Sequence, residues 1–263
     1  MRDPKSILIT GASSGIGAAL AREYAGPGCT LFLGGRNQSR LDELTADCTA
    51  RGAAVESAAI DVTDAGAIAE WIATSDDRAP LDLVIANAGI SAGTGTAGEP
   101  RDQAQRIMAI NVDGVINTVH PALERFAARP APVTDPGVKG QIAVMSSLAS
   151  FRGFAGAPAY CASKAAVRNY GEGLRNAYAR GGINVSVICP GFVQSGMTDA
   201  NDFAMPFLMD GDRAARIIRR GLARNRGRIA FPWQMYGAAW LVQALPTWST
   251  DWAMRSLPNK ASD

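Results

Sequence analysis

The chain has 263 residues, of which 47% are hydrophobic and 19% charged, and its formal net charge is +2. This composition is that of a globular protein and excludes both low-complexity disorder and a collagen-like repeat. The small net charge does not indicate nucleic-acid binding, so we expect no nucleic-acid partner.

Apolar runs that predict β-strands alternate with longer helical patterns along most of the chain. The first two strands, 6–10 and 30–35, are each followed by a helical pattern, at 18–25 and 37–52. Nearly continuous apolar runs are typical of parallel strands that are buried on both faces. The repeated strand–helix units predict one α/β domain over residues 1–263, a doubly wound parallel sheet with helices on both faces. The further strands are predicted at 54–61, 81–89, 140–147 and 183–191, and the further helices at 102–128 and 158–180.

Four segments lie outside this alternation. Residues 129–139 contain three prolines and predict an exposed loop, and residues 192–212 predict a mobile flap. Residues 213–228 predict a helix with seven arginines and no acid, and the tail 229–263 holds four of the five tryptophans. One interpretation packs the tail over a cleft or against a second subunit, with the arginines on a solvated helix face. The alternative is a peripheral membrane contact, with tryptophans at the headgroup level and arginines meeting anionic lipid.

The counts of histidine and cysteine limit the chemistry. His120 is the only histidine, so a site of several histidines is excluded, no metal is expected, and His120 is predicted to be a surface or packing residue. The four cysteines have no CxxC spacing and are predicted to be reduced thiols. Without a signal-type apolar core or a run of 18 apolar residues, we expect a cytoplasmic protein, with the membrane surface as the alternative location.

A glycine-rich segment, Thr10–Gly17, lies between the first predicted strand and the first predicted helix. The free amides at a helix N-terminus and the positive end of its dipole suit a pyrophosphate. Residues without side chains let the ligand approach and let the helix pack closely on the strand. The segment therefore predicts a dinucleotide site that includes Gly11, Ser13, Ser14, Gly15, Ile16 and Gly17.

The TGxxxGxG spacing of this segment is accompanied by five further motifs. They are Asn87-Ala88-Gly89, Asn111, Ser147, Tyr160-x-x-x-Lys164 and Pro190-Gly191. On these motifs, over residues 5 to about 195, the chain resembles the short-chain dehydrogenase/reductase family, in its branch of about 250 residues, and Arg36 favours the NADP-preferring members of that branch. The resemblance implies a single Rossmann-like domain, a nicotinamide cofactor, and a homodimer or homotetramer. Many family members end in a strand and a short tail, a pattern that this chain is not expected to follow.

Tyr160 and Lys164 lie four residues apart on a predicted helix and therefore share one face. An ammonium and an oxidised nicotinamide beside a phenol would lower the pKa of Tyr160, which is the expected acid/base. The resemblance implies that Lys164 also binds the nicotinamide ribose. Ser147, at a strand end, is expected to polarise the substrate oxygen, in preference to Ser146. The resemblance implies that Asn111 kinks its helix and anchors a water linked to Lys164 in a proton relay. The alternative is that Asn111 only kinks the helix.

The preference between NAD(H) and NADP(H) depends on the residue that follows the second strand. A carboxylate there would repel a 2′-phosphate, but Arg36 can pair with it and Ser14 can add a donor. We therefore expect NADP(H), with NAD(H) as the alternative if Arg36 is an ordinary surface residue. The resemblance implies further contacts, with adenine at Asp61 and Val62, adenosine at Asn87, Ala88 and Gly89, and nicotinamide at Pro190, Gly191, Val193 and Ser195.

Together these features predict an NADP(H)-dependent oxidoreductase that transfers hydride between nicotinamide and a ketone, aldehyde or secondary alcohol. The aromatic tail resembles the C-terminal segments of some lipid- and steroid-handling family members, and this likeness implies a hydrophobic or lipid-like substrate, with 192–212 as the substrate flap. The alternative is a non-catalytic NADP(H)-binding sensor or scaffold, although such relatives usually lack the tyrosine or the lysine. An epimerase or dehydratase is not expected, because the roughly 70 residues after Gly191 are too few for a substrate domain.

Overall fold

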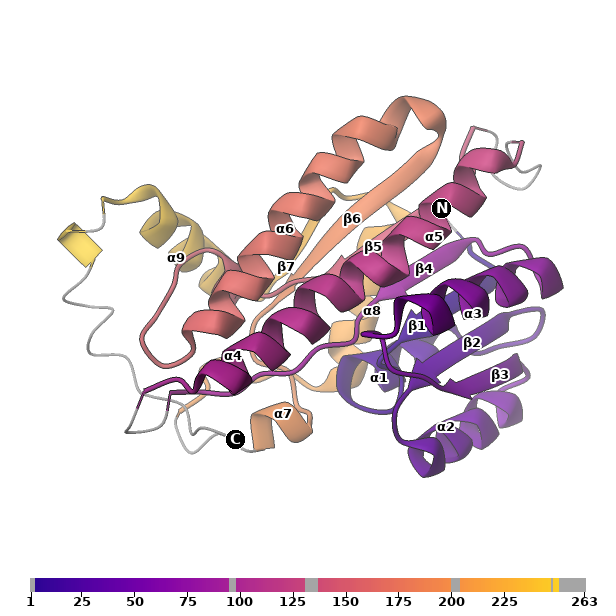
Figure 1. Ribbon diagram of the computed structural model, residues 1–263, viewed down its shortest axis with the longest axis horizontal. Helices are drawn as coiled ribbons and strands as arrows, with labels where there is room; N and C mark the ends of the chain where they lie inside the picture. The colour runs from indigo at the N-terminus through magenta and orange to yellow at the C-terminus, as the bar shows by residue number, and fades with distance from the viewer. Residues whose placement is uncertain (1–2, 95–97, 131–136, 200–203, 247, 251–263) are drawn as a thin grey trace.

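In the part of the chain that the structure describes, seven parallel strands form one sheet with helices on both faces (Figure 1). This computed structural model describes residues 3–94, 98–130, 137–199, 204–246 and 248–250. The strand order is β3-β2-β1-β4-β5-β6-β7. The strands are β1 (Ser6–Thr10), β2 (Thr30–Gly35), β3 (Ala54–Ala59), β4 (Leu83–Ala86), β5 (Gly140–Met145), β6 (Ile183–Pro190) and β7 (Arg228–Phe231).

The helices divide between the two faces of the sheet, and each set buries its own apolar core against the strands. The predicted doubly wound α/β fold is therefore confirmed. One face carries α1 (Gly15–Tyr24), α2 (Gln38–Ala50) and α8 (Gly211–Ala223), and the other carries α3 (Ala65–Arg78), α5 (Gly114–Ala128) and α6 (Pro158–Tyr178).

The order of the strands determines where a ligand can bind. The chain builds outward from β1 to β2 and β3, then returns to the other side of β1 with β4. The connections that leave β1 and β4 thus diverge to opposite faces and open a crevice at the carboxyl ends of these strands. The glycine-rich segment follows β1, and Asn87 follows β4, so both lie at this crevice.

The strand at 54–61 differs from the expectation of burial on both faces. β3 is an edge strand with only β2 beside it, and its residues are exposed or half-buried. Glu56 on this strand forms an ion pair of 2.8 Å with Arg78 at the end of α3. Charged side chains on an edge strand discourage pairing with another chain.

In the C-terminal region two expectations were wrong, namely the length of the arginine-rich helix and the absence of a terminal strand. The predicted helix 213–228 ends at Ala223 as α8, and β7 follows it and pairs in parallel with β6. The terminal strand that we expected the chain to lack is therefore present. It forms because Ile229 and Phe231 alternate inward into the core. The tail then continues as a helix, α9 (Trp233–Ala244), which the sequence analysis did not predict.

The predicted helix 102–128 is two α-helices joined by a wider turn. α4 (Arg101–Met108) leads into a π-helical turn, Ala109–Asp113, and then into α5. Such a turn inserts an extra residue per turn and changes the direction of the helix. The turn contains Asn111, the residue for which a helix kink was predicted.

Several smaller predictions concern single residues and segments. The four cysteines are free and buried, and His120 is exposed with its ring 6.2 Å from that of Tyr170. Within the described ranges, no helix is both long and apolar enough to cross a bilayer. Parts of the predicted loop, flap and tail lie outside the described residues, namely 131–136, 200–203, 247 and 251–263.

Candidate active site

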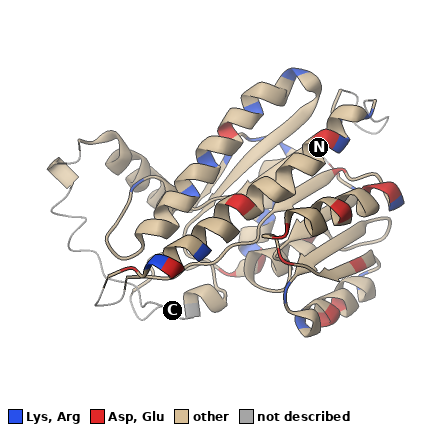
Figure 2. Cartoon of the chain, viewed as in Figure 1, with Lys and Arg blue, Asp and Glu red and all other residues tan. Residues whose placement is uncertain are grey.

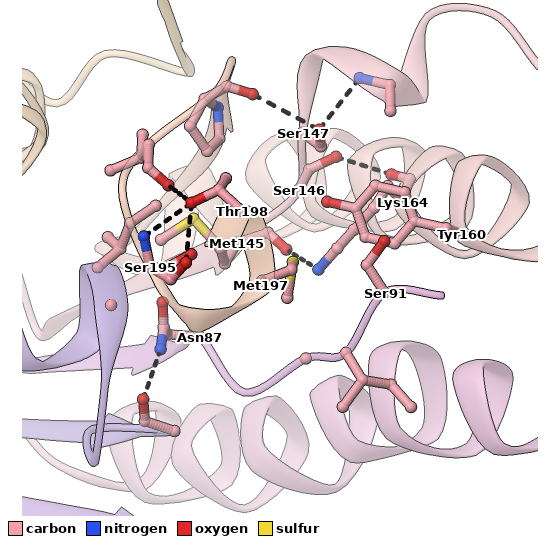
Figure 3. Close-up of a pocket in the computed structure, with 18 of the residues that line it drawn as sticks. Asn87, Ser91, Met145, Ser146, Ser147, Tyr160, Lys164, Ser195, Met197 and Thr198 are labelled. Atoms are coloured by element: carbon pink, nitrogen blue, oxygen red, sulfur yellow. Dashed lines mark hydrogen bonds between the residues drawn. The ribbon is translucent and has the colours of Figure 1, made fainter. Parts of the chain in front are cut away.

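A cavity of about 860 Å³ lies at the carboxyl ends of the strands, and Figure 3 shows the part around Tyr160. All but two of the residues predicted from the sequence line this cavity. The exceptions are Gly17 and Asn111, which lie behind its wall. The predicted residues in the wall are Gly11, Ser13, Ser14, Gly15, Ile16, Arg36, Asp61, Val62, Asn87, Ala88, Gly89, Ser147, Tyr160, Lys164, Pro190, Gly191, Val193 and Ser195.

The glycine turn requires residues without a side chain. Gly11 and Gly15 have φ values of +65° and +54°, a region that residues with a Cβ rarely adopt. A Cβ on Gly17 would lie 2.3 Å from the carbonyl oxygen of Gly11 and 2.6 Å from Nδ2 of Asn87. Gly17 therefore acts by close packing behind the turn, which explains its absence from the cavity wall.

Asn87 joins β4 to the glycine turn. Its Nδ2 donates hydrogen bonds of 3.0 Å to the carbonyl oxygens of both Thr10 and Gly11. Its backbone N–H donates to the hydroxyl of Thr10 at 3.1 Å. The side chain was predicted at the adenosine, but its amide donors are used to hold the turn in shape, although the residue does line the cavity.

A group of polar side chains follows β2 and β3 at one end of the cavity. Arg36 is exposed after β2, and Asn37 caps α2 by accepting a hydrogen bond from the backbone N–H of Arg40 at 3.0 Å. Both arginines line the cavity beside Ser13 and Ser14. Arg40 was not predicted from the sequence, although its position four residues after Arg36 was a usable signal.

Asp61 follows β3 and lines the same cavity as these arginines. Its Oδ1 accepts hydrogen bonds of 2.9 Å from both the backbone N–H and the hydroxyl of Thr63. These hydrogen bonds, with a contribution from the charge of Arg36, hold the pKa of the Asp61 carboxyl below its ordinary value. Asp61 is therefore a fixed carboxylate at neutral pH.

Ser147, Tyr160 and Lys164 meet in the middle of the cavity (Figure 3). The Ser147 hydroxyl accepts a hydrogen bond from the N–H of Ala149 at 3.1 Å and lies 3.5 Å from the carbonyl oxygen of Pro190. Nζ of Lys164 lies 5.9 Å from the centre of the Tyr160 ring. Two of these groups come from α6 and one from the end of β5, so the sheet and one helix together position them.

Burial determines the protonation of both groups on α6. It raises the pKa of Tyr160, and the Ser147 hydroxyl only partly opposes the rise. This direction differs from the lowered pKa that was expected, because burial disfavours the charged phenolate more than its neighbours stabilise it. The same effect lowers the pKa of Lys164 to about 8, and its Nζ donates a hydrogen bond to the carbonyl oxygen of Met145 at 3.0 Å. At neutral pH the site thus holds a phenol and an ammonium.

Ser146 and Asn111 hold the backbone around the site. Ser146 also lines the cavity, and its hydroxyl donates to the carbonyl oxygen of Lys164 at 2.7 Å, so that proton is used within the protein. The side-chain amide of Asn111 accepts from the N–H of Ile90 at 2.8 Å and donates to its carbonyl oxygen at 2.9 Å. Its Nδ2 also donates to the hydroxyl of Ser163 at 3.0 Å. Asn111 therefore fixes the loop after β4 against α6.

The segment after β6 forms a further wall. The N–H of Ser195 donates to Oγ1 of Thr198 at 2.8 Å, and the same hydroxyl contacts the carbonyl oxygen of Val193 at 3.2 Å. Thr198 lines the cavity but was not predicted, because its contribution depends on the short helix α7 (Gly196–Asp199). Ser91, in the loop after β4, also lines the cavity and was not predicted from the sequence; Figure 3 labels it together with Tyr160.

The remaining wall is largely apolar and comes from three segments distant in the sequence. The segment after β5 contributes Leu148, Phe151 and Phe154. The predicted flap contributes Met197 and Pro206, while α9 contributes one of its faces. The residues of α9 in the wall are Met235, Ala238, Ala239 and Val242.

Comparisons with known proteins agree with this architecture. Residues 5–204 match the family model described as short chain dehydrogenase. An uncharacterized oxidoreductase of Myxococcus xanthus is 37% identical over 96% of this chain and 97% of its own length. One of Mycobacterium tuberculosis is 34% identical over 87% of this chain and 88% of its own.

More distant matches include one relative with a named substrate and one solved structure. The gluconate 5-dehydrogenase of Gluconobacter oxydans is 32% identical over 73% of this chain and 72% of its own length. The crystal structure of a short-chain dehydrogenase from Streptomyces avermitilis has a TM-score of 0.78 at 24% identity and covers 95% of this chain and 96% of that one. This last likeness concerns the fold alone.

Proposed function

The chain belongs to the short-chain dehydrogenase family and is an NAD(P)-dependent oxidoreductase, and from this premise we propose that it transfers hydride between NADP(H) and an apolar ketone or secondary alcohol. The observation that carries the proposal is the meeting of Ser147, Tyr160 and Lys164 in the same cavity as the glycine turn. A proton donor, a second hydroxyl and an ammonium are what reduction of a carbonyl requires beside a nicotinamide.

The residues present fit a dinucleotide. Ser14 precedes α1 without capping it through its side chain, and Gly15 and Ile16 line the cavity at the helix N-terminus. The first-turn amides are therefore available to a pyrophosphate, with the dipole of α1 favouring its charge. Asp61 and Val62 would hold the adenine, and Lys164 the nicotinamide ribose.

When bound, the nicotinamide supplies hydride in reduction and accepts it in oxidation. Tyr160 donates its proton to the substrate carbonyl oxygen in reduction and takes a proton from the alcohol in oxidation. Ser147 donates a hydrogen bond to the same oxygen and orients it. Lys164 stabilises the phenolate that Tyr160 becomes, while Asn111 is a positioning residue that fixes the β4 loop against α6.

The rate of reduction should depend on the charge of Lys164. Burial lowers the pKa of this amine to about 8, so it is positive below that pH and neutral above it. Because the positive charge favours the phenolate left after proton donation, kcat/KM for ketone reduction should be level near neutral pH and fall above about pH 8. A pH series at saturating NADPH measures this. A rate that stays level up to about pH 10 would contradict the assigned role of Lys164.

A preference for NADP(H) is expected because Arg36, Arg40, Ser13 and Ser14 at one end of the cavity could bind the 2′-phosphate. The double variant Arg36→Ala with Arg40→Ala should weaken NADPH binding about tenfold to a hundredfold and leave NADH binding nearly unchanged, since charge-assisted hydrogen bonds contribute about 1.5–3 kcal/mol. Titration of the fluorescence of each bound cofactor measures this. Arg216→Ala, an exposed arginine of α8, is the matched control. An equal loss for both cofactors would mean that the arginines do not contact the 2′-phosphate.

The apolar wall supports a hydrophobic substrate. Phe151, Phe154, Met197 and Met235 offer few partners for the hydroxyls of a sugar acid, the substrate in the name of the gluconate 5-dehydrogenase relative. We expect NADPH oxidation with medium-chain and cyclic ketones and little or none with sugar-derived keto acids. Oxidation of NADPH by polar ketones alone would overturn the substrate class. Binding of NADPH without turnover of any carbonyl would favour the alternative, a sensor or scaffold.

We also propose that residues 192–212 act as a substrate flap and that the protein is an oligomer. Met197, Thr198 and Pro206 line the cavity, which supports the segment 192–212 as a substrate flap. We propose a homodimer or homotetramer as the family resemblance implies, and light scattering of the purified protein would distinguish these states from a monomer.

A further inference from the structure

The exposed apolar side chains of this protein gather around the cavity. Nine large hydrophobic side chains are exposed in the described part of the chain, and eight of them lie in two segments, 197–208 and 233–248. Both segments also contribute residues to the cavity wall. Scattered exposed hydrophobic residues need no explanation, but a concentration around one opening indicates a surface that contacts something.

α9 is apolar on both of its sides. Its inner face lines the cavity through residues such as Met235 and Val242. Its outer face presents Trp233, Trp240 and Leu241, whose exposed fractions are 76%, 56% and 55%. These positions are separated by seven and eight residues, so they lie along one side of the helix.

Contacts of α9 with α6, with β7 and with Phe151 keep that outer face turned outward. Arg168 of α6 donates a hydrogen bond of 3.2 Å to Gln243, and Arg228 of β7 donates one of 3.3 Å to the hydroxyl of Tyr236. The Tyr236 ring also packs edge-on against Phe151, with the ring centres 5.6 Å apart. The tryptophans therefore cannot turn inward without breaking these contacts.

We propose that this surface docks on a lipid bilayer, with the mouth of the cavity facing the membrane. The surface, called here the apolar rim, consists of Trp233, Trp240, Leu241, Leu245 and Trp248 from the tail. Met197, Phe207 and Leu208 complete it from the flap. An apolar substrate would then pass from the lipid into the apolar part of the cavity. The passage rests on the proposed function, whereas the docking does not.

The chemistry of the rim favours a bilayer over a protein partner. Tryptophan prefers the interface between water and lipid because its ring is apolar and its N–H is polar. Between Arg228 and Asp251 the sequence has no charged residue, and in Figure 2 the ribbon of α9 carries neither the blue of Lys and Arg nor the red of Asp and Glu. Protein interfaces are usually bordered by charged and polar side chains that fix the partner, and α9 offers none of these charges.

The arginines of α8 do not belong to this surface. α8 packs with α1 on one face of the sheet, whereas α9 is bonded to α6, which lies on the other face. The expected pairing of tryptophans with arginines on one membrane element therefore does not hold for the arginines of α8, although Arg228, from the same arginine-rich run, is hydrogen-bonded to α9. In sequence the flap adds four acids, Asp199, Asp202, Asp210 and Asp212, and no bases. Docking should thus depend on apolar contact, with little dependence on anionic lipid or on salt.

Flotation of the full-length protein with phosphatidylcholine vesicles tests the proposal. The variant with Trp233→Gln, Trp240→Gln and Leu241→Gln should show about a tenfold lower vesicle-bound to free ratio, since binding scales with the apolar area that enters the lipid. Met108→Gln replaces the ninth exposed side chain, which lies on α4 outside both segments, and should float like the wild type. Added phosphatidylglycerol or salt should change the ratio by less than about twofold.

Three results would overturn the docking. They are a wild type that does not float, equal flotation of the triple variant, and a triple substitution that splits an oligomer in light scattering, which would make the rim an interface between copies. NADPH binding by the triple variant serves as the folding control, because none of its three positions lines the cavity. Flotation together with a lack of NADPH oxidation would leave the docking standing and reject the proposed function, so the two failures can be told apart.

Discussion

Tyr160→Phe is expected to reduce turnover by about 10²–10⁴-fold. The variant keeps the aromatic ring but loses the hydroxyl that donates a proton to the substrate oxygen. NADPH affinity should stay within about twofold, since the hydroxyl that is removed does not hold the phosphates or the adenine. Steady-state NADPH oxidation with an apolar ketone and a fluorescence titration of NADPH measure the two quantities separately.

Ser147→Ala provides the comparison for Tyr160→Phe. It removes a hydroxyl from the same part of the cavity without removing the proton donor, so its loss of turnover should be smaller. Turnover of Tyr160→Phe near the wild-type value would reject Tyr160 as the acid/base. A large loss of NADPH affinity in this variant would instead assign the hydroxyl to cofactor binding.

Gly17→Ala is expected to weaken NADPH binding about fivefold to a hundredfold. The added Cβ would meet the Gly11 carbonyl oxygen at 2.3 Å and Nδ2 of Asn87 at 2.6 Å, so the turn must move. Overpacking of this kind costs about 1–3 kcal/mol, and the moved turn no longer presents its amides to the pyrophosphate. Calorimetric titration of NADPH into the variant measures the change.

Gly173→Ala is the matched control, because this glycine also lies in a helix but an added Cβ meets nothing within 4 Å. That variant should bind NADPH normally and unfold at a slightly higher temperature, since alanine is the better helix former by about 0.5–1 kcal/mol. Normal NADPH binding by Gly17→Ala, with an unchanged circular dichroism spectrum, would mean that the turn does not hold the cofactor.

The fold could be predicted from the sequence wherever the strands are apolar throughout. β1, β2 and β6 are long buried runs, and their predicted positions agree with the structure to within about a residue. β7 was missed because it has four residues, begins with an arginine and follows a helix rich in the same residue. Its existence depends on pairing with β6, which is a contact between distant parts of the chain.

The sequence was sufficient to predict most residues of the candidate site, but not their hydrogen-bond partners. Motif spacing was sufficient to bring Ser147, Tyr160 and Lys164 to one cavity, since strand ends and one helix face determine their positions. The partners of Asn87 and Asn111 were not predictable, because they are backbone groups of β1 and of the loop after β4. The contribution of α9 was likewise hidden, since only the folded chain brings it to the cleft.

A crystal structure of the protein with NADP⁺ would be the decisive test of the proposed site. We expect the pyrophosphate on the glycine turn, the 2′-phosphate beside Arg36 and Arg40, and the Tyr160 hydroxyl facing the nicotinamide ring across the space where a substrate would lie. A dinucleotide bound elsewhere, or a Tyr160 hydroxyl directed away from the nicotinamide in the complex, would contradict the proposed site.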